Sequence, residues 1–194
     1  DLPPQLPITE QLLPYEQLLE ARPAGQIDLV VIHCTELPDL AMAREYGERA
    51  LYPAGTGNSG HYYIDRDGRI YLYVRPGRTA NHTRGYNPRS IGIEIVNVGR
   101  FPDWLHSTHQ DMPEAYTEAQ IEQLIALLDS DDADDVARMR EALATLGVVL
   151  SAGSAPRELR VHGVRGRFPV GRAELFLGNA GTAAALGNPA DRRE

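Results

Sequence analysis

The sequence predicts an α/β domain whose central mixed β-sheet is flanked by helices, with a small βα extension at its C-terminal end. Three observations lead to this prediction. Apolar or alternating runs of strand length recur along the chain. A turn containing glycine joins two of these runs as a hairpin. Runs with the periodicity of amphipathic helices lie between and after them.

The first strand is predicted over residues 27–33, where four apolar residues lead directly into His33 and no Gly or Pro follows until Pro38. Open α/β sheets place their ligands at the carboxyl ends of such strands. Neutral imidazole is also the commonest protein ligand of metals. His33 is therefore a candidate zinc ligand, and a zinc site would need at least two more ligands.

A hairpin is predicted over residues 61–74, because Asp67-Gly68 separates two runs of strand character. Residues 90–96 alternate as a strand does, although Glu94 stands among apolar neighbours. The loop that follows carries Trp104, which either stacks on a sugar or anchors the loop. It also carries two histidines that we expect to be exposed, His106 and His109.

Helices are predicted over residues 39–52 and 117–128, and the second opens with a capping-box pattern from Thr117 to Gln120. After an acidic run at 129–135, a third helix is predicted up to Gly147. Short strands are then expected at 148–150, 159–162 and 173–177.

Composition narrows the possible functions. The chain has 194 residues, 42% of them hydrophobic, which is enough to bury a core. The net charge of −8 argues against a nucleic-acid partner. No apolar run approaches the roughly 18 residues that a membrane span needs. The single cysteine, Cys34, excludes an internal disulfide and a cysteine-rich zinc site.

Three segments in register resemble the zinc-dependent N-acetylmuramoyl-L-alanine amidases, a group that includes amidase-type phage lysozymes and peptidoglycan recognition proteins. The segments are Val31-Ile-His-Cys-Thr35, Gly60-His-Tyr-Tyr-Ile-Asp-Arg-Asp-Gly68 and His82-Thr-Arg-Gly-Tyr-Asn-Pro-Arg-Ser-Ile-Gly-Ile-Glu94. They occur in the order of the family and at about its spacing, within residues 27–128.

The resemblance implies a role for each matching residue. His33 corresponds to the first zinc ligand, and Glu94 to the catalytic glutamate that assists a zinc-bound water as general base. His61 and His82 correspond to histidines that line the substrate cleft. Position 60, where some relatives carry a functional tyrosine, is Gly here. That difference removes one possible contact to the transition state.

The family's second and third zinc ligands have no clear match. His162 is the only histidine after position 109, and no Asp or Cys follows it until Asp191. Arg172-Ala-Glu174 mimics the family's Lys-x-Asp element, and zinc accepts a Glu ligand. The implied metal ligands are therefore His33 and His162, with Zn²⁺ as a cofactor whose ligand set is incomplete.

Residues 127–186 instead resemble an N-terminal segment of enolpyruvylshikimate-phosphate synthase. The most specific piece is Ala173-Glu-Leu-Phe-Leu-Gly-Asn-Ala-Gly-Thr-Ala183. In that family this turn lies beside the phosphoenolpyruvate site, but the arginine that should follow is absent here. The resemblance therefore indicates a chimera with an N-terminal arm (1–26), an amidase-like domain (27–128), a synthase-like βα segment (129–186) and a frayed tail (187–194).

The function that these resemblances imply is hydrolysis of the N-acetylmuramoyl–L-alanine bond of peptidoglycan by a zinc-activated water. Two alternatives stay open: a peptidoglycan-binding module without zinc, and an inactive chimera. We expect a monomer that faces the cell wall, in the periplasm or secreted, with a signal segment removed before Asp1.

Overall fold

The computed structural model describes residues 6–23, 26–27, 29–106, 108–109 and 113–128, together with three short strands nearer the C-terminus. The helix predicted up to Gly147, the tail at 187–194 and His162 lie outside the described residues. The division of the chain into an arm, two segments and a tail stays a prediction.

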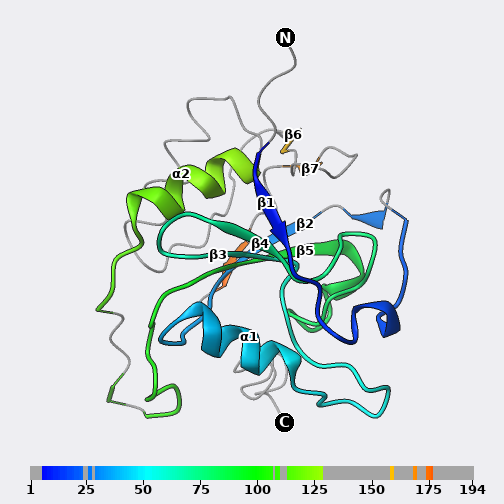
Figure 1. The fold of residues 1–194 in the computed structure, drawn as a ribbon, viewed down its shortest axis with the longest axis horizontal. Helices are drawn as coiled ribbons and strands as arrows, with labels where there is room; N and C mark the ends of the chain where they lie inside the picture. Colours follow the sequence, from blue (N-terminus) through cyan, green and yellow to red (C-terminus); the bar gives the residue numbers. More distant parts are fainter. Residues whose placement is uncertain are drawn as a thin grey trace.

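A mixed six-stranded sheet forms the centre of the fold, in the order β1-β4-β3-β5-β2-β8 (Figure 1). The β3–β4 pair is antiparallel and the other neighbours are parallel. This confirms the predicted α/β class. The strands are β1 (Ile8–Glu10), β2 (Leu29–Cys34), β3 (Tyr62–Ile64), β4 (Ile70–Leu72), β5 (Ser90–Ile95) and β8 (Glu174–Phe176). A separate two-stranded sheet joins β6 (Glu158–Leu159) to β7 (Phe168–Pro169).

Strand β5 lies at the centre of the sheet and is buried along its whole length. Such burial explains its apolar residues, because parallel strands are covered on both faces. Its neighbour β2 pairs with it from Leu29↔Ser90 to Cys34↔Ile95. The strands predicted at 27–33 and 90–96 are therefore confirmed, each to within two residues at its ends.

The predicted hairpin is confirmed as β3 and β4, which pair from Tyr62↔Leu72 to Ile64↔Ile70. Gly68 closes its turn with a φ of +87°, and its N–H donates to the Asp65 carbonyl at 2.8 Å. A side chain at this position would be strained, which explains the glycine.

Helix α2 (Glu118–Leu127) covers one face of the sheet (Figure 1). The Thr117 side chain accepts from the Gln120 N–H, and the Gln120 side chain accepts from the Thr117 N–H, so the predicted capping box is present. The apolar side of this helix packs on the main hydrophobic core, which includes Ile32, Ile64, Ile93, Ile95 and Leu124.

Helix α1 (Leu40–Glu48) lies on the opposite face of the sheet, and Asp39 caps its N-terminus. It packs against a second core that includes Leu37, Ala43, Tyr63 and Tyr73. The sequence predicted a helix as far as residue 52, but α1 ends at Glu48. Pro53 disfavours helical backbone at the residue before it, which accounts for part of the difference.

The sequence predicted an N-terminal arm over residues 1–26. The 3₁₀ helix η1 (Glu16–Leu18) is present, and a second one, η3 (Asn87–Arg89), precedes β5. The sequence did not predict that β1 pairs with β4 from Ile8↔Ile70 to Glu10↔Leu72. Tyr15 also donates its hydroxyl to the Gly47 carbonyl at 2.5 Å. Residues 6–23 of the arm are therefore part of the packed fold.

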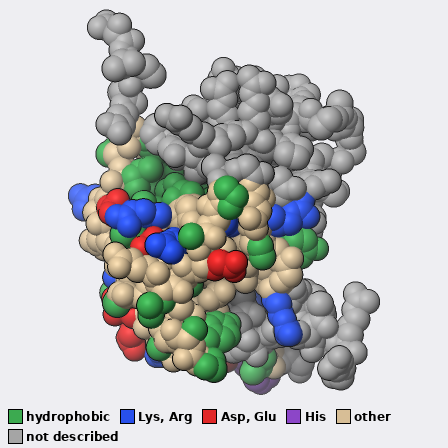
Figure 2. All heavy atoms as spheres, turned by 90° about the vertical axis from the view of Figure 1, so that its right-hand side faces the viewer, with side chains coloured by type: hydrophobic (Ala, Val, Ile, Leu, Met, Phe, Trp, Pro, Cys, Tyr) green, Lys and Arg blue, Asp and Glu red, His purple; other side chains and the backbone are tan. Residues whose placement is uncertain are grey.

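The surface carries interspersed charges. On the face shown in Figure 2, basic and acidic side chains alternate with apolar ones over the described residues, without a broad area of one sign. Among the described residues, no helix has both the length and the apolar character that crossing a membrane requires.

Candidate functional site

His33 and Glu94 are register partners on neighbouring strands, β2 and β5. Tyr63 is the partner of Glu94 on β3. Because paired residues of parallel strands point to the same side, the three side chains form a row on one face of the sheet. Tyr63 belongs to the core on the α1 side, which places His33 and Glu94 on that face. The sheet thus brings together the two residues that the sequence proposed as ligand and base.

Glu94 is a fully buried carboxyl group, and neither of its oxygens has a hydrogen-bond partner among the described residues. Burial, and then the charge of Glu36, raises its pKa well above the ordinary value. Buried polar groups are nearly always hydrogen-bonded, so an exception calls for a functional explanation. A carboxyl group in this state is suited to exchanging a proton.

Because Gly60 has no side chain, the Glu94 side chain can pack against it. A Cβ atom on residue 60 would lie 2.8 Å from Glu94 Cγ and 3.1 Å from the Gly92 carbonyl oxygen. The sequence singled out position 60 as one where some relatives carry a tyrosine. In this chain no larger side chain fits there unless Glu94 moves.

His82 joins His33 in the buried site. Nε2 of His33 lies 2.9 Å from Nδ1 of His82, and Thr83 Oγ1 is 3.1 Å from each of these nitrogens. On the other side of the His82 ring, Nε2 lies 2.9 Å from Ser90 Oγ. The ring lies over Gly92, where a Cβ atom would approach it to 2.7 Å.

His61 is held by the backbone on both sides of its ring. The Gly92 N–H donates to Nδ1 at 2.9 Å, so the proton of the neutral ring is on Nε2. Nε2 in turn donates to the Arg78 carbonyl at 3.0 Å. Arg22, whose guanidinium donates to two backbone carbonyls, lies 3.1 Å from the same nitrogen. Both nitrogens of His61 are thus in contact with protein groups.

All three histidines are neutral at physiological pH. Burial lowers the pKa of His33 and of His61 to about 3. Burial, and then the proximity of His33, lowers the pKa of His82 well below its ordinary value. A neutral imidazole has a lone pair available to a metal or a hydrogen-bond donor.

Among the described residues, only one expected ligand, His33, has the properties that a zinc ligand requires. His33 is a neutral imidazole at a strand end, as a zinc ligand must be. No group of three or more His, Cys, Asp or Glu within the described part of the chain has the arrangement of a metal site. The other expected ligand, His162, lies outside that part. Of Glu174 only the backbone is described, where it pairs with Val31 of β2.

Sequence reasoning missed Arg22, Thr83 and Ser90. These residues hold the histidines in place, and all three are buried. Ser90 had a usable signal, because it lies two and four residues before Gly92 and Glu94 and so shares their face of β5. Arg22 had none, since its contact with His61 joins segments 39 residues apart.

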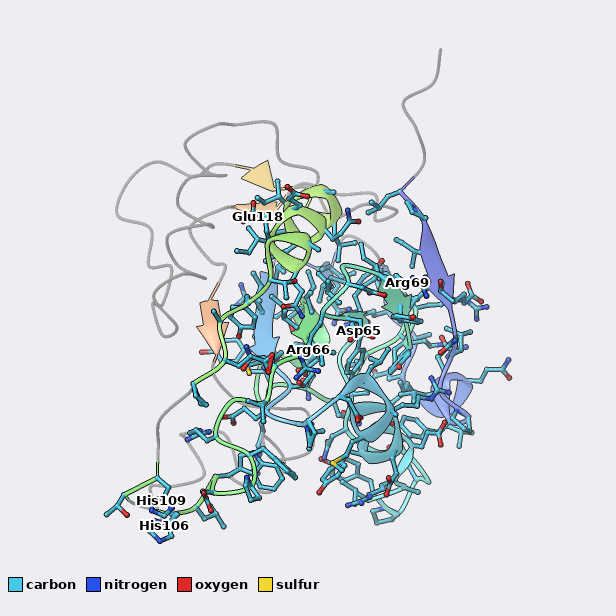
Figure 3. The ribbon with its side chains drawn as sticks, turned by 60° about the vertical axis from the view of Figure 1, so that its left-hand side comes forward. Asp65, Arg66, Arg69, His106, His109 and Glu118 are labelled. Atoms are coloured by element: carbon cyan, nitrogen blue, oxygen red, sulfur yellow. The ribbon has the colours of Figure 1, made fainter. Side chains whose placement is uncertain are left out.

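His106 and His109 are exposed, as the sequence predicted. Their rings stack at 4.0 Å between centroids, at the end of the loop after β5 (Figure 3). Trp104 of the same loop donates its indole N–H to the Glu36 carbonyl at 3.0 Å, so it does anchor the loop.

Curated relatives match only a short part of the chain. The 3-phosphoshikimate 1-carboxyvinyltransferase of Neisseria meningitidis is 54% identical over 61 residues, which are 31% of this chain and 13% of that enzyme. The enzyme of the same name from Laribacter hongkongensis is 52% identical over 52 residues, 27% of this chain and 12% of its own length. The chain thus spans about an eighth of these relatives. The match fits the synthase-like segment expected from the sequence.

Several solved structures are similar to part of the chain. The N-acetylmuramoyl-L-alanine amidase LysC from Clostridium intestinale is 22% identical, with a TM-score of 0.47 over 63% of this chain and 72% of that one. An AmpD derivative is 24% identical, with a TM-score of 0.46; the match covers 62% of this chain and 71% of the AmpD chain. The Drosophila peptidoglycan recognition protein SA is 18% identical, with a TM-score of 0.46; the match covers 66% of this chain and 76% of the Drosophila chain.

The family model described as N-acetylmuramoyl-L-alanine amidase matches residues 23–135, which is more than half of the chain. The matched range includes the three residues of the row, His33, Glu94 and Tyr63, and also His61 and His82. The chain therefore belongs to the N-acetylmuramoyl-L-alanine amidase family.

Proposed function

We propose that the chain is a peptidoglycan amidase that hydrolyses the amide bond between the N-acetylmuramoyl group and L-alanine. The observation that carries the proposal is the Glu94 carboxyl group. It is fully buried beside His33 and has no hydrogen-bond partner among the described residues. A protein gains no stability from such a group, so its retention favours a chemical role.

Glu94 would act as general base and then as general acid. It takes a proton from the water that attacks the amide carbonyl carbon. The carbon–nitrogen bond then breaks, and Glu94 returns the proton to the departing amino group of L-alanine. Burial raises the pKa of Glu94, which makes its carboxylate a stronger base toward the attacking water.

His33 would hold zinc through Nδ1, because its Nε2 is in contact with His82 and Thr83. A bound zinc ion would polarise the amide carbonyl and lower the pKa of a water molecule to about 7. His162, together with the carboxylate of Glu174, would complete the ligands, as the family resemblance implies.

His61 and His82 are proposed to lie directly beneath the substrate. Both rings are buried, and their nitrogens are in contact with protein groups. Their contribution to substrate binding would therefore come from holding His33 and β5 in position. A direct hydrogen bond to the substrate would require one of the rings to turn.

The expected substrate places the protein at the cell wall, in the periplasm or outside the cell, acting as a monomer. A second candidate function is recognition of peptidoglycan without cleavage. It is favoured by one observation: within the described ranges, no group of three potential ligands forms a metal site. An inactive chimera would share that feature and would not bind peptidoglycan.

The test combines metal content with cleavage of sacculi. Purified protein is analysed for zinc, and soluble peptides released from sacculi are measured with and without a chelator. Near-stoichiometric zinc and chelator-sensitive release, both lost in His33→Ala, are expected of the amidase. Release should also be lost in Glu94→Gln, which keeps the metal. Protein that co-sediments with sacculi but contains no zinc and releases nothing is a binding module. Protein that does neither is an inactive chimera.

A further inference from the structure

The Tyr63 hydroxyl closes a cycle of three hydrogen bonds around Gly60, the Gly60 cycle. The Gly60 N–H donates to the Tyr63 hydroxyl oxygen at 3.3 Å, and the Ser59 hydroxyl donates to the Gly60 carbonyl at 2.8 Å. Because that bond uses the one hydroxyl proton of Ser59, the Tyr63 hydroxyl is the donor in its 3.0 Å contact with Ser59 Oγ. Each of the three donors in the Gly60 cycle therefore has one acceptor.

The Gly60 cycle is buried and is attached to the backbone on both sides. Ser59 and Tyr63 are each 1% exposed, so a broken bond would leave polar atoms away from water. On one side, the Ser59 N–H donates to the Asn81 carbonyl at 3.0 Å. On the other side, the His61 N–H donates to the Gly92 carbonyl at 2.8 Å. These two bonds and the cycle together hold the intervening backbone in one position.

Packing positions the Glu94 side chain within the described part of the chain. Neither of its carboxyl oxygens has a hydrogen-bond partner among the described residues. The side chain rests against the Gly60 backbone, because a Cβ atom on residue 60 would lie 2.8 Å from Glu94 Cγ. Tyr63 is the register partner of Glu94 on β3, the neighbouring strand (Figure 1). The position of Gly60 therefore helps to decide where the Glu94 carboxyl group lies.

From these contacts we propose that Tyr63 is a positioning residue for Glu94 and acts through the backbone of Gly60. The Tyr63 hydroxyl fixes the Gly60 backbone, and this backbone fixes the Glu94 side chain by contact. The inference rests on the proposed function, in which Glu94 transfers the proton. Displacing a reacting group by about 1 Å can lower a rate about 100-fold, so a support of this kind has a large effect.

The Tyr63 hydroxyl stays in the form that the Gly60 cycle requires. Burial, and then the nearby charge of Glu94, raises the pKa of Tyr63 well above its ordinary value. The hydroxyl therefore keeps its proton around neutral pH and can donate to Ser59 Oγ. Both of its contacts are within the cycle, so Tyr63 acts on the reaction through Gly60 and not by touching the substrate.

Tyr63→Phe tests the proposal, because it removes the hydroxyl and keeps the aromatic ring. With a soluble N-acetylmuramoyl peptide as substrate, kcat should fall at least about tenfold and KM should change by less than about twofold. Tyr73→Phe is the matched control. Its ring lies 4.3 Å from that of Tyr63 and is equally buried, but its hydroxyl is not part of the Gly60 cycle. This control should keep the wild-type kcat, and equal losses in the two variants overturn the proposal.

Ser59→Ala breaks the same cycle by a smaller change, so it also tests the proposal where Tyr63→Phe does not fold. It should lower kcat in the same way. Because both substitutions disrupt one structure, the double variant should have a kcat no more than about twofold below that of Tyr63→Phe. Losses that multiply would show that the two hydroxyl groups act independently, which contradicts a shared cycle.

Nuclear magnetic resonance gives a readout that does not need activity. In Tyr63→Phe, the Gly60 amide should exchange its hydrogen at least about tenfold faster, because it loses its acceptor. The His61 amide, which is bonded to Gly92, should keep its wild-type rate. At constant pH, the carbon signal of the Glu94 carboxyl group should shift in Tyr63→Phe alone. Equal acceleration of both amides, or a Glu94 signal that does not move, overturns the proposal.

The positioning role and the amidase activity can fail separately. Wild-type protein that releases no peptide overturns the amidase activity, whereas the amide exchange and the Glu94 signal still decide whether Tyr63 positions Glu94. Wild-type release together with an unchanged kcat in Tyr63→Phe supports the amidase and overturns the positioning role.

Discussion

His33 and His82 share one short contact, 2.9 Å between Nε2 of the first and Nδ1 of the second. Only one of these nitrogens can carry the proton between them. If His33 binds zinc through Nδ1, its Nε2 carries the proton and donates to His82. The proton of His82 is then on its Nε2, which donates to Ser90 Oγ at 2.9 Å. One metal bond would thus fix both tautomers.

Replacing His82 should weaken zinc binding. His82→Ala removes the group that accepts from His33, and losing such a partner typically lowers metal affinity by about 10–100-fold. Competition with a chromophoric chelator measures the affinity. His82→Asn, whose amide oxygen can still accept, should lose less, and exposed His106→Ala should lose nothing. Wild-type affinity in His82→Ala would show that His82 does not support a metal on His33.

Gly60→Ala should both destabilise the protein and displace Glu94. The new Cβ would lie 2.8 Å from Glu94 Cγ, and overpacking of this kind costs about 1–3 kcal/mol. Urea unfolding gives the change in free energy of unfolding, and peptide release from sacculi gives the change in activity. Gly77→Ala is the matched control, because a Cβ there meets nothing within 4 Å. Equal unfolding curves for the two variants would contradict the expected crowding at residue 60.

Local signals in the sequence predicted the elements that depend on local chemistry. The hairpin follows from Asp67-Gly68, and helix α2 from its capping box. The pairing of β1 with β4 and of β8 with β2 was not predicted, because it joins segments that are distant in the chain. Nothing in a three-residue strand specifies which neighbour it will find.

The candidate site shows the same difference between features that local sequence signals and contacts between distant segments determine. His33 and Glu94 stand out in the sequence because each is a polar residue in an apolar strand. Their pairing across β2 and β5 required only that the two strands lie side by side. The contact of Arg22 with His61 depends on the path of the N-terminal segment through the folded protein. No periodicity or spacing could have predicted it.

The raised pKa of Glu94 predicts how the free energy of unfolding of the metal-free protein depends on pH. Burial raises this pKa above the value of about 4.3 in the unfolded chain. The folded state therefore holds the proton more tightly, so the contribution of this group to stability is complete below about pH 4.3. It is lost as the pH rises through the folded-state value. Glu94→Gln, which stays neutral, should stabilise the protein more at pH 8 than at pH 4.

Urea unfolding with a chelator at pH 4, 6 and 8 measures this difference. Glu114→Gln is the control of opposite sign, because its hydrogen bonds with Arg66 lower the pKa of Glu114. That variant should lose more stability at pH 8 than at pH 4. A Glu94→Gln difference that is constant across the three pH values would mean that Glu94 titrates as an ordinary carboxyl group.

The Glu36–Arg100 pair should contribute far more to stability than the Arg66–Glu114 pair. Arg100→Ala leaves the fully buried Glu36 carboxylate without its main partner, and breaking buried pairs in this way costs about 3–5 kcal/mol. The Arg66 and Glu114 side chains are 35% and 25% exposed, so Arg66→Ala should cost about 1 kcal/mol or less. Urea unfolding compares the two variants. Because Trp104 is bonded to Glu36, its emission should also shift to longer wavelength in Arg100→Ala alone. Equal costs, or unchanged emission, would show that the loop holds its position without the ion pair.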